Sequence, residues 1–221
     1  MTLKLRLLIA LPLLAALSAP AAALSPEKTQ PVAASAAEVK PLGVGAAVPD
    51  VKLTNADGLD FPLSRLLKNQ PTVLIFYRGG WCVYCNAQLG QLKQVEVDLQ
   101  KLGYQIVAIS PDKVDKIRES LKKHNLTYML LSDSKAEAIQ SFGLAFQVDD
   151  ATYSKYKKDY GLDLETEAGA KHHLLPVPAA YVVDQKGKIH WVYYNSDFKV
   201  RVDAQALLKA AADAVPAQRK Q

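Results

Sequence analysis

Residues 71–89 read PTVLIFYRGGWCVYCNAQL, and the expected local structure changes in the middle of this stretch. Residues 71–78 form a continuous β-branched and aromatic run, which is typical of a strand buried on both faces. Over residues 86–102, leucines and a valine recur every three or four positions, and this spacing predicts an amphipathic helix. Cys82 and Cys85, the two cysteines of the chain, therefore lie where a buried strand is followed by a long helix.

A C-x-x-C pair at the start of a helix has a specific chemistry. Its sulfurs can close a small disulfide ring, and the free N–H groups and positive dipole end of the helix favour a thiolate. We expect Cys82, at or just before the helix, to be the more exposed and more easily ionised sulfur. Cys85 lies one turn further along and is placed to resolve a mixed disulfide formed by Cys82. Trp81 is expected to form an apolar wall beside the sulfur.

A C-x-x-C pair can also be a static disulfide or half of a zinc site. A static disulfide across two intervening residues would constrain almost nothing in the unfolded chain. A zinc half-site would need two further ligands, for which the available histidines are His124, His172, His173 and His190. Redox use of the pair is therefore favoured.

The rest of the chain alternates between runs typical of strands and apolar spacings typical of helices. Further strands are predicted at residues 104–110, 127–131, 179–183 and 189–194, and further helices at residues 114–121, 135–142 and 203–215. This order predicts an α/β fold with parallel strands and an antiparallel edge pair, in a central mixed sheet flanked by helices on both faces.

The predicted domain organisation has four parts. Residues 1–23 have a short basic start, an apolar core and small residues before Ala23, the pattern of a signal peptide. Residues 24–45 are rich in Ala, Pro and Ser and are expected to be a flexible linker. The folded domain is placed at residues 46–216, with an insertion at about 143–171 and a polar tail at 217–221. Secretion, to the periplasm of a bacterium, would bring the cysteines into an oxidising compartment, with no membrane span left after cleavage.

Composition excludes several classes of protein. Of the 221 residues, 49% are hydrophobic, which excludes a wholly disordered or collagen-like chain. The formal net charge of +5 includes Lys4 and Arg6 of the predicted signal peptide. Since no basic stripe with interleaved aromatics follows, no nucleic-acid partner is expected.

These motifs resemble a known family. The strand, the Trp81-Cys82-x-x-Cys85 motif, the helix and the later Pro178 before a strand resemble the thioredoxin fold. More specifically, FYRGGWCVYCNAQL and VPAAYVVDQKGKI resemble the peroxiredoxin-like branch of the alkyl hydroperoxide reductase/thiol-specific antioxidant (redoxin) family. The resemblance covers residues 43–215.

The resemblance implies two different roles for the cysteines. In thioredoxin-like oxidoreductases the first cysteine, here Cys82, attacks and Cys85 resolves, while a cis proline, here Pro178, holds the substrate backbone close. In peroxiredoxins the pattern P-x-x-x-T-x-x-C would make Cys85 the peroxide-cleaving residue, with Cys82 at the threonine position and Arg78 at the proline position. Pro178 then occupies the place of the arginine that activates the peroxide, and Arg78 or Arg201 is a candidate replacement.

From these motifs we expect a thiol–disulfide oxidoreductase that cycles Cys82 and Cys85 between dithiol and disulfide with protein thiol partners. The alternative is a thiol-dependent peroxidase that reduces hydroperoxides with electrons from a reducing thiol protein. A lesser alternative is a copper chaperone that uses the cysteines with His172 or His173. Without that role, these histidines are a solvated pair in a loop, or one of them accepts a proton from a thiol. No organic cofactor and no metal are expected.

Three features are expected to contact the substrate, namely Trp81, Tyr84 and Pro178. Tyr84 either tunes the choice of partner or covers the start of the helix. The insertion at 143–171 is either a packed flap or a binding lid. The sequence leaves open the direction of exchange, the reduction potential and the oligomeric state.

Overall fold

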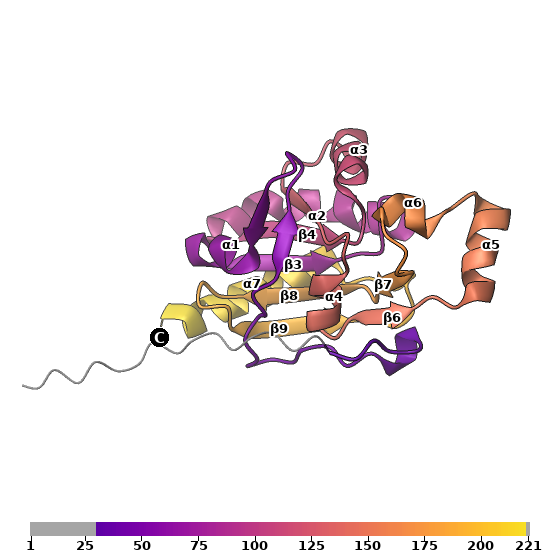
Figure 1. Cartoon of the computed structure of the whole chain (residues 1–221). Coiled ribbons are helices and arrows are strands. Elements are labelled where there is room, and N and C mark those ends of the chain that lie inside the picture. Colours follow the sequence, from indigo (N-terminus) through magenta and orange to yellow (C-terminus); the bar gives the residue numbers. More distant parts are fainter. Residues whose placement is uncertain (1–29, 220–221) are drawn as a thin grey trace, which may run out of the picture.

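The computed structural model describes residues 30–219, shown in Figure 1. The predicted signal peptide at 1–23 lies outside these described residues. None of the helices within residues 30–219 is long and apolar enough to cross a membrane.

A seven-stranded mixed sheet forms the centre of the domain, with the strand order β2-β1-β5-β4-β3-β8-β9. Its strands are β1 (Lys52–Thr54), β2 (Asp60–Pro62), β3 (Thr72–Phe76), β4 (Gln105–Ser110), β5 (Met129–Ser132), β8 (Ala179–Val183) and β9 (Ile189–Tyr194). β3, β4 and β5 are parallel, while β8 runs antiparallel to β3 and pairs with β9. The predicted parallel strands with an antiparallel edge pair are therefore confirmed. β1 and β2, which form the opposite edge, were not predicted.

Helices cover both faces of this sheet. They are α1 (Leu63–Asn69), α2 (Val83–Lys101), α3 (Val114–His124), α4 (Glu137–Ser141), α5 (Asp150–Tyr160), α6 (Leu164–Ala168) and α7 (Ala204–Arg219), with a short 3-10 helix at Ala36–Glu38. Alternate residues of β3 belong to different cores: Leu74 and Phe76 pack with the residues of α1 and α4, while Val73 and Ile75 pack with those of α2 and α7. Burial on both faces explains why this strand reads as an unbroken apolar run. The predicted fold class, thioredoxin-like α/β, is confirmed.

The predicted flexible linker at 24–45 is wrong over its described part. The backbone of Ala33 bonds to that of Ala145, and the N–H of Leu42 donates to the carbonyl of Phe142. Ala36, Val39 and Leu42 pack against the core beside α4. This segment is held because its apolar residues, sparse as they are, cover part of that core.

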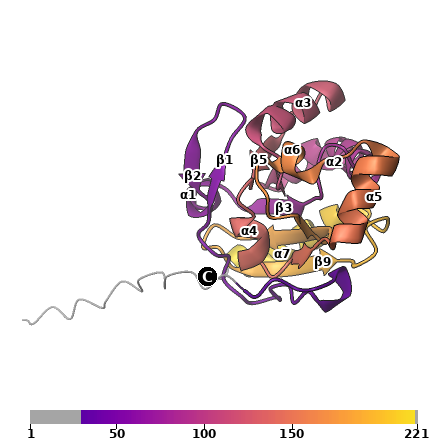
Figure 2. The ribbon, with the colours of Figure 1, turned by 45° about the vertical axis from the view of Figure 1, so that its right-hand side comes forward.

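The predicted insertion at 143–171 is largely regular structure. It contains β6 (Ala145–Gln147), which pairs with β7 (Leu174–Pro176) in a separate two-stranded sheet, followed by α5 and α6. Figures 1 and 2 both show α5 at the periphery of the domain, on the side to which β6 leads. At the other end of the chain, α7 continues to Arg219, so part of the predicted polar tail is helical.

Candidate active site

The turn from β3 to α2 places both cysteines. Cys82 is the N-cap residue of α2, with extended backbone angles, and its Sγ accepts a hydrogen bond of 3.4 Å from the N–H of Cys85. The preceding turn needs a glycine at position 79, where φ is +153° and a Cβ atom would collide with the indole of Trp81. The N–H of Gly80 donates to Asp112 at 2.8 Å, which anchors the turn to the end of β4.

The two thiols are free and lie in different surroundings. Cys82 is 4% exposed and lines a cleft, whereas Cys85 is 0% exposed and packs in the core under the helix. A small reagent entering the cleft therefore meets Cys82, while Cys85 is screened from solvent.

The surroundings separate the acidities of the two thiols. A hydrogen bond from the Cys85 side chain lowers the pKa of Cys82 to about 5, against burial, with help from the Cys85 N–H and the charges of Arg78 and Arg201. Burial, followed by the bond that it gives to Cys82, raises the pKa of Cys85 well above its usual value. The two pKa values separate because hydrogen bonds stabilise the charged form of Cys82, whereas burial disfavours the charged form of Cys85. At neutral pH the pair is a Cys82 thiolate with a protonated Cys85 behind it.

Arg201 provides a cation in direct contact with both sulfurs. Its Nη2 lies 3.2 Å from Sγ of Cys85 and 3.8 Å from Sγ of Cys82. Its Nε and Nη1 are buried and have no hydrogen-bond partner among the described residues. The sequence offered Arg201 as a candidate replacement for the missing arginine, but no local pattern joins it to the cysteines.

Arg78 is a second guanidinium beside the pair, and it lies among aromatic rings. It is 4% exposed, and its guanidinium carbon lies 4.3 Å from the ring centroid of Phe198 and 4.9 Å from that of Trp81. Its Nη2 donates a 2.7 Å hydrogen bond to the hydroxyl of Tyr156 on α5. The position that the peroxiredoxin pattern gives to proline thus holds a buried cation.

An open cleft of about 410 Å³ leads to Cys82. Trp81 and Tyr84, both predicted to contact substrate, line it together with Phe198. Tyr84 is 40% exposed, and its ring lies 5.8 Å from that of Phe198. The remaining lining residues are Arg78, Val83, Tyr156, Tyr160, Gly161, Leu162 and Glu167. The 143–171 segment thus supplies one wall of the cleft. Phe198 was not predicted, because no motif or periodic pattern includes it.

Pro178 does not adopt the predicted cis conformation. No peptide bond among residues 30–219 is cis, so the expectation of a cis proline is wrong. Pro178 is buried, is absent from the cleft lining, and lies between β7 and β8, where its carbonyl accepts from the N–H of Asn195. The neighbouring Val177 also donates to the backbone of Leu144, so backbone hydrogen bonds hold this segment on both sides of Pro178.

His172 and His173 form hydrogen bonds with groups other than the sulfurs. The Nε2 of His172 lies 3.0 Å from the carbonyl of Ser134, and its Nδ1 accepts from the N–H of Leu174. The Nε2 of His173 bonds to Glu165 at 2.9 Å. The described residues contain no group of three or more His, Cys, Asp or Glu side chains that could hold a metal ion. The structure therefore gives no support to the copper-chaperone alternative.

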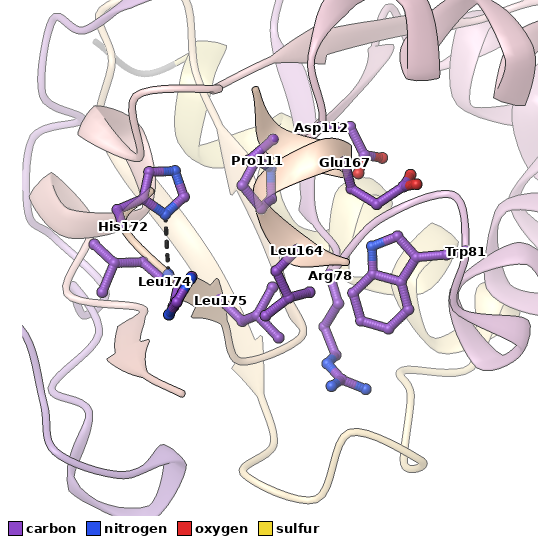
Figure 3. A pocket seen from close by; sticks show the side chains of 11 residues that line it. Arg78, Trp81, Pro111, Asp112, Leu164, Glu167, His172, Leu174 and Leu175 are labelled. Atoms are coloured by element: carbon purple, nitrogen blue, oxygen red, sulfur yellow. Dashed lines mark hydrogen bonds between the residues drawn. The ribbon is translucent and has the colours of Figure 1, made fainter. Parts of the chain in front are cut away.

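Asp112 is a buried carboxyl that the sequence analysis missed. It accepts from the N–H of Gly80 and from the hydroxyl of Ser110, and burial raises its pKa to about 7. Figure 3 shows it near Glu167 and the Trp81 ring, around a small cavity of about 10 Å³. Its position under the 79–80 turn indicates a part in holding the turn that presents Cys82.

A mixed sheet with a cysteine pair at the strand-to-helix junction defines the thioredoxin-like class of proteins. Comparison with known families is more specific, because residues 44–192 match the AhpC/TSA family. The chain belongs to this family, and the resemblance drawn from the motifs is confirmed.

Individual relatives are distant but consistent. The chain is 25% identical over 171 residues to a putative peroxiredoxin bcp of Helicobacter pylori, covering 76% of this chain and 97% of that one. It is 26% identical over 151 residues to a chloroplastic peroxiredoxin Q of Oryza sativa, covering 68% of this chain and only 58% of the plant protein. Among solved structures it is similar in fold to peroxidoxin BcpB of Mycobacterium tuberculosis, with a TM-score of 0.61, 23% identity, and coverage of 80% of this chain and 97% of that one.

Proposed function

We propose that the protein is a thiol-dependent peroxidase in which Cys82 is the nucleophile and Cys85 the resolving thiol. The observation that carries the proposal is the division of the pair: the thiol that lines the cleft has a pKa of about 5, and the one beneath it stays protonated. The relatives, which are peroxiredoxins, favour a hydroperoxide over a protein disulfide as the oxidant.

The proposed cycle uses the two thiols of the chain and an external thiol reductant. The Cys82 thiolate attacks the hydroxyl oxygen of the peroxide, the O–O bond breaks, and the departing alkoxide takes a proton from solvent water, which leaves an alcohol and a Cys82 sulfenic acid. Cys85 then loses its proton, its sulfur bonds to that of Cys82, and water leaves. Two thiol groups of an external reductant then supply two electrons and two protons, which restore the Cys82–Cys85 dithiol and leave the reductant as a disulfide. The Nη2 of Arg201, within 3.8 Å of both sulfurs, stabilises the negative charge that passes between them.

Single cysteine variants test the assignment. Cys82→Ser is expected to abolish peroxide consumption. Cys85→Ser is expected to complete one attack and to stop at a sulfenic acid on Cys82, which a dimedone adduct in mass spectrometry would locate. The reverse pattern, with peroxide consumption retained by Cys82→Ser and lost in Cys85→Ser, would assign the attack to Cys85 instead.

Dithiol–disulfide exchange with a partner protein is a second candidate function. The specific observation in its favour is that Cys82, as a low-pKa thiol at a helix N-cap, is a good leaving group from a mixed disulfide. The equilibrium potential of the pair against glutathione, together with insulin reduction, separates the two candidates. Rapid exchange with protein disulfides and no peroxide consumption would favour this second function.

We also propose that the protein is exported to an oxidising compartment, as the pattern of residues 1–23 predicts.

A further inference from the structure

The cleft beside Cys82 is larger and more apolar than hydrogen peroxide requires. Its volume of about 410 Å³ is more than ten times the ~30 Å³ that one water molecule occupies in the liquid. It falls in the range of sites that bind small organic molecules, about 300–1,000 Å³. Aromatic side chains form much of its surface: Trp81, Tyr84, Tyr156, Tyr160 and Phe198.

A buried cation without a carboxylate partner lies in this aromatic wall. Within residues 30–219, Arg78 forms no ion pair, although it is only 4% exposed, and its Nε has no hydrogen-bond partner. The acid that shares the cleft, Glu167, is paired with Lys116 on α3 at 3.4 Å. In Figure 3 the guanidinium of Arg78 points away from the carboxylates of Asp112 and Glu167.

Such a cation has a clear chemical preference. Burying a charge without a counter-ion costs free energy, and a carboxylate that enters the cleft would supply the missing partner in a charge-assisted hydrogen bond. The rings of Phe198 and Trp81, at 4.3 and 4.9 Å, hold the guanidinium in place, so that little freedom is lost on binding. The same rings offer apolar area to the body of the ligand.

We propose that this cleft binds small organic molecules that carry a carboxylate on an apolar body, with the carboxylate on Arg78, and that its preferred hydroperoxides are of this class. The substrate part of the proposal rests on the proposed peroxidase function, whereas the binding part does not. Arg78 is thus a specificity-determining residue, at a position where the family pattern has a proline.

Binding of a compound that cannot react tests the proposal without any peroxide. The reduced protein is titrated calorimetrically with 4-isopropylbenzoate and with the neutral 4-isopropylbenzamide of nearly the same shape. The carboxylate is expected to bind at least tenfold more tightly, and the preference is expected to weaken as salt is raised. Equal affinities in the wild-type protein would overturn the proposal, and this comparison depends on no variant.

Variants then locate the carboxylate. Arg78→Gln is expected to remove the preference for the benzoate while leaving the weak binding of the amide. Arg65→Gln changes an exposed arginine of α1 that does not line the cleft, and is the matched control that should keep the preference. Tyr156→Phe removes the hydrogen bond to Arg78 and serves if the glutamine variant does not fold; a several-fold loss of benzoate affinity is then expected. An unchanged preference in Arg78→Gln would refute the assignment of Arg78.

A kinetic arm addresses the substrate class. Cumene hydroperoxide is compared with its ring carboxylate, and the carboxylate is expected to have the higher kcat/KM by at least tenfold in the wild type and by less than threefold in Arg78→Gln. If neither peroxide is consumed, the proposed function fails while the calorimetric result still decides the binding site. If both are consumed equally fast, the peroxidase stands and the substrate preference is refuted.

Discussion

The acidity of Cys82 can be tested through the residue that contributes most to it. The side chain of Cys85 is the largest cause of the lowered pKa, which is about 5. Replacing Cys85 with alanine removes this hydrogen-bond donor, whereas replacing it with serine keeps a donor of similar size. Both variants leave Cys82 as the sole thiol of the chain, so its titration is free of any signal from a second sulfur.

The size of the effect follows from the strength of the lost bond. Hydrogen bonds to charged groups contribute about 1.5–3 kcal/mol, and because a thiol is a weak donor we take the lower figure. One pKa unit corresponds to about 1.36 kcal/mol, so Cys85→Ala is expected to raise the pKa of Cys82 to ~6. At pH 5 the thiolate fraction would fall from about one half to about one tenth, whereas at pH 7.5 it would hardly change.

Two measurements report this fraction: thiolate absorbance near 240 nm and the rate of alkylation by iodoacetamide across pH 4–8. Cys85→Ala is expected to react about fivefold more slowly than Cys85→Ser at pH 5, and at nearly the same rate at pH 7.5. Overlapping profiles with a midpoint near 5 in both variants would refute the role of the Cys85 donor. A midpoint above 8 in the serine variant would refute the whole description of Cys82 as a thiolate.

Three further predictions follow from other parts of the site. Arg201→Met removes a cation 3.8 Å from the sulfur of Cys82, and we expect the pKa of that thiol to rise by about one and the reaction with peroxide to slow by about tenfold, as stopped-flow kinetics would measure. Burial raises the pKa of Asp112 to about 7, so its protonated form stabilises the fold at pH values below the ordinary pKa of an aspartate, and this stabilisation is lost as the pH rises through 7. Asp112→Asn should therefore reduce the fall in unfolding free energy between pH 5 and 8, as urea titrations would measure. Gly79→Ala places a Cβ at a φ of +153° and against Trp81, and thermal unfolding should show a loss of about 1–3 kcal/mol, whereas an unchanged melting temperature would contradict the turn geometry.

The sequence was sufficient to predict the central strands of the sheet, because these strands carry strong local signals. β3 has both faces buried, so five consecutive apolar or β-branched residues record its position. β1 and β2 are three residues each and mostly not buried, and strands so short leave no alternation to detect. The packing of residues 30–45 escaped prediction for a similar reason, since a few scattered apolar side chains make the contacts.

In the candidate site, too, the residues with a local sequence signal were predicted, and the contacts between distant residues were not. The C-x-x-C motif is local and was found, together with Trp81 and Tyr84 beside it. The contact between Arg201 and Cys85 spans 116 residues and involves a loop whose sequence has no periodicity. The cis conformation expected of Pro178 came from the family resemblance and from no property of this chain, and the structure contradicts it.

The displaced arginine also bears on which cysteine reacts first. In the peroxiredoxin pattern the nucleophile falls on Cys85, with the activating arginine at the place of Pro178. Here the cation comes from Arg201 instead, and its Nη2 is nearer to Cys85 than to Cys82, so proximity to the guanidinium alone would favour the deeper sulfur. Burial decides against it, because a charge on a fully buried sulfur loses more hydration than one at the floor of a cleft. The Sγ of Cys82 also accepts hydrogen bonds from the N–H and from the thiol of Cys85, and both bonds favour its charged form.

For Cys85 to attack first, the start of α2 would have to open and expose it. The opening would then limit the rate of peroxide reduction, and this rate would stop rising at a low peroxide concentration. A rate that rises linearly with peroxide and follows the ionisation of Cys82 is therefore the behaviour that this geometry requires.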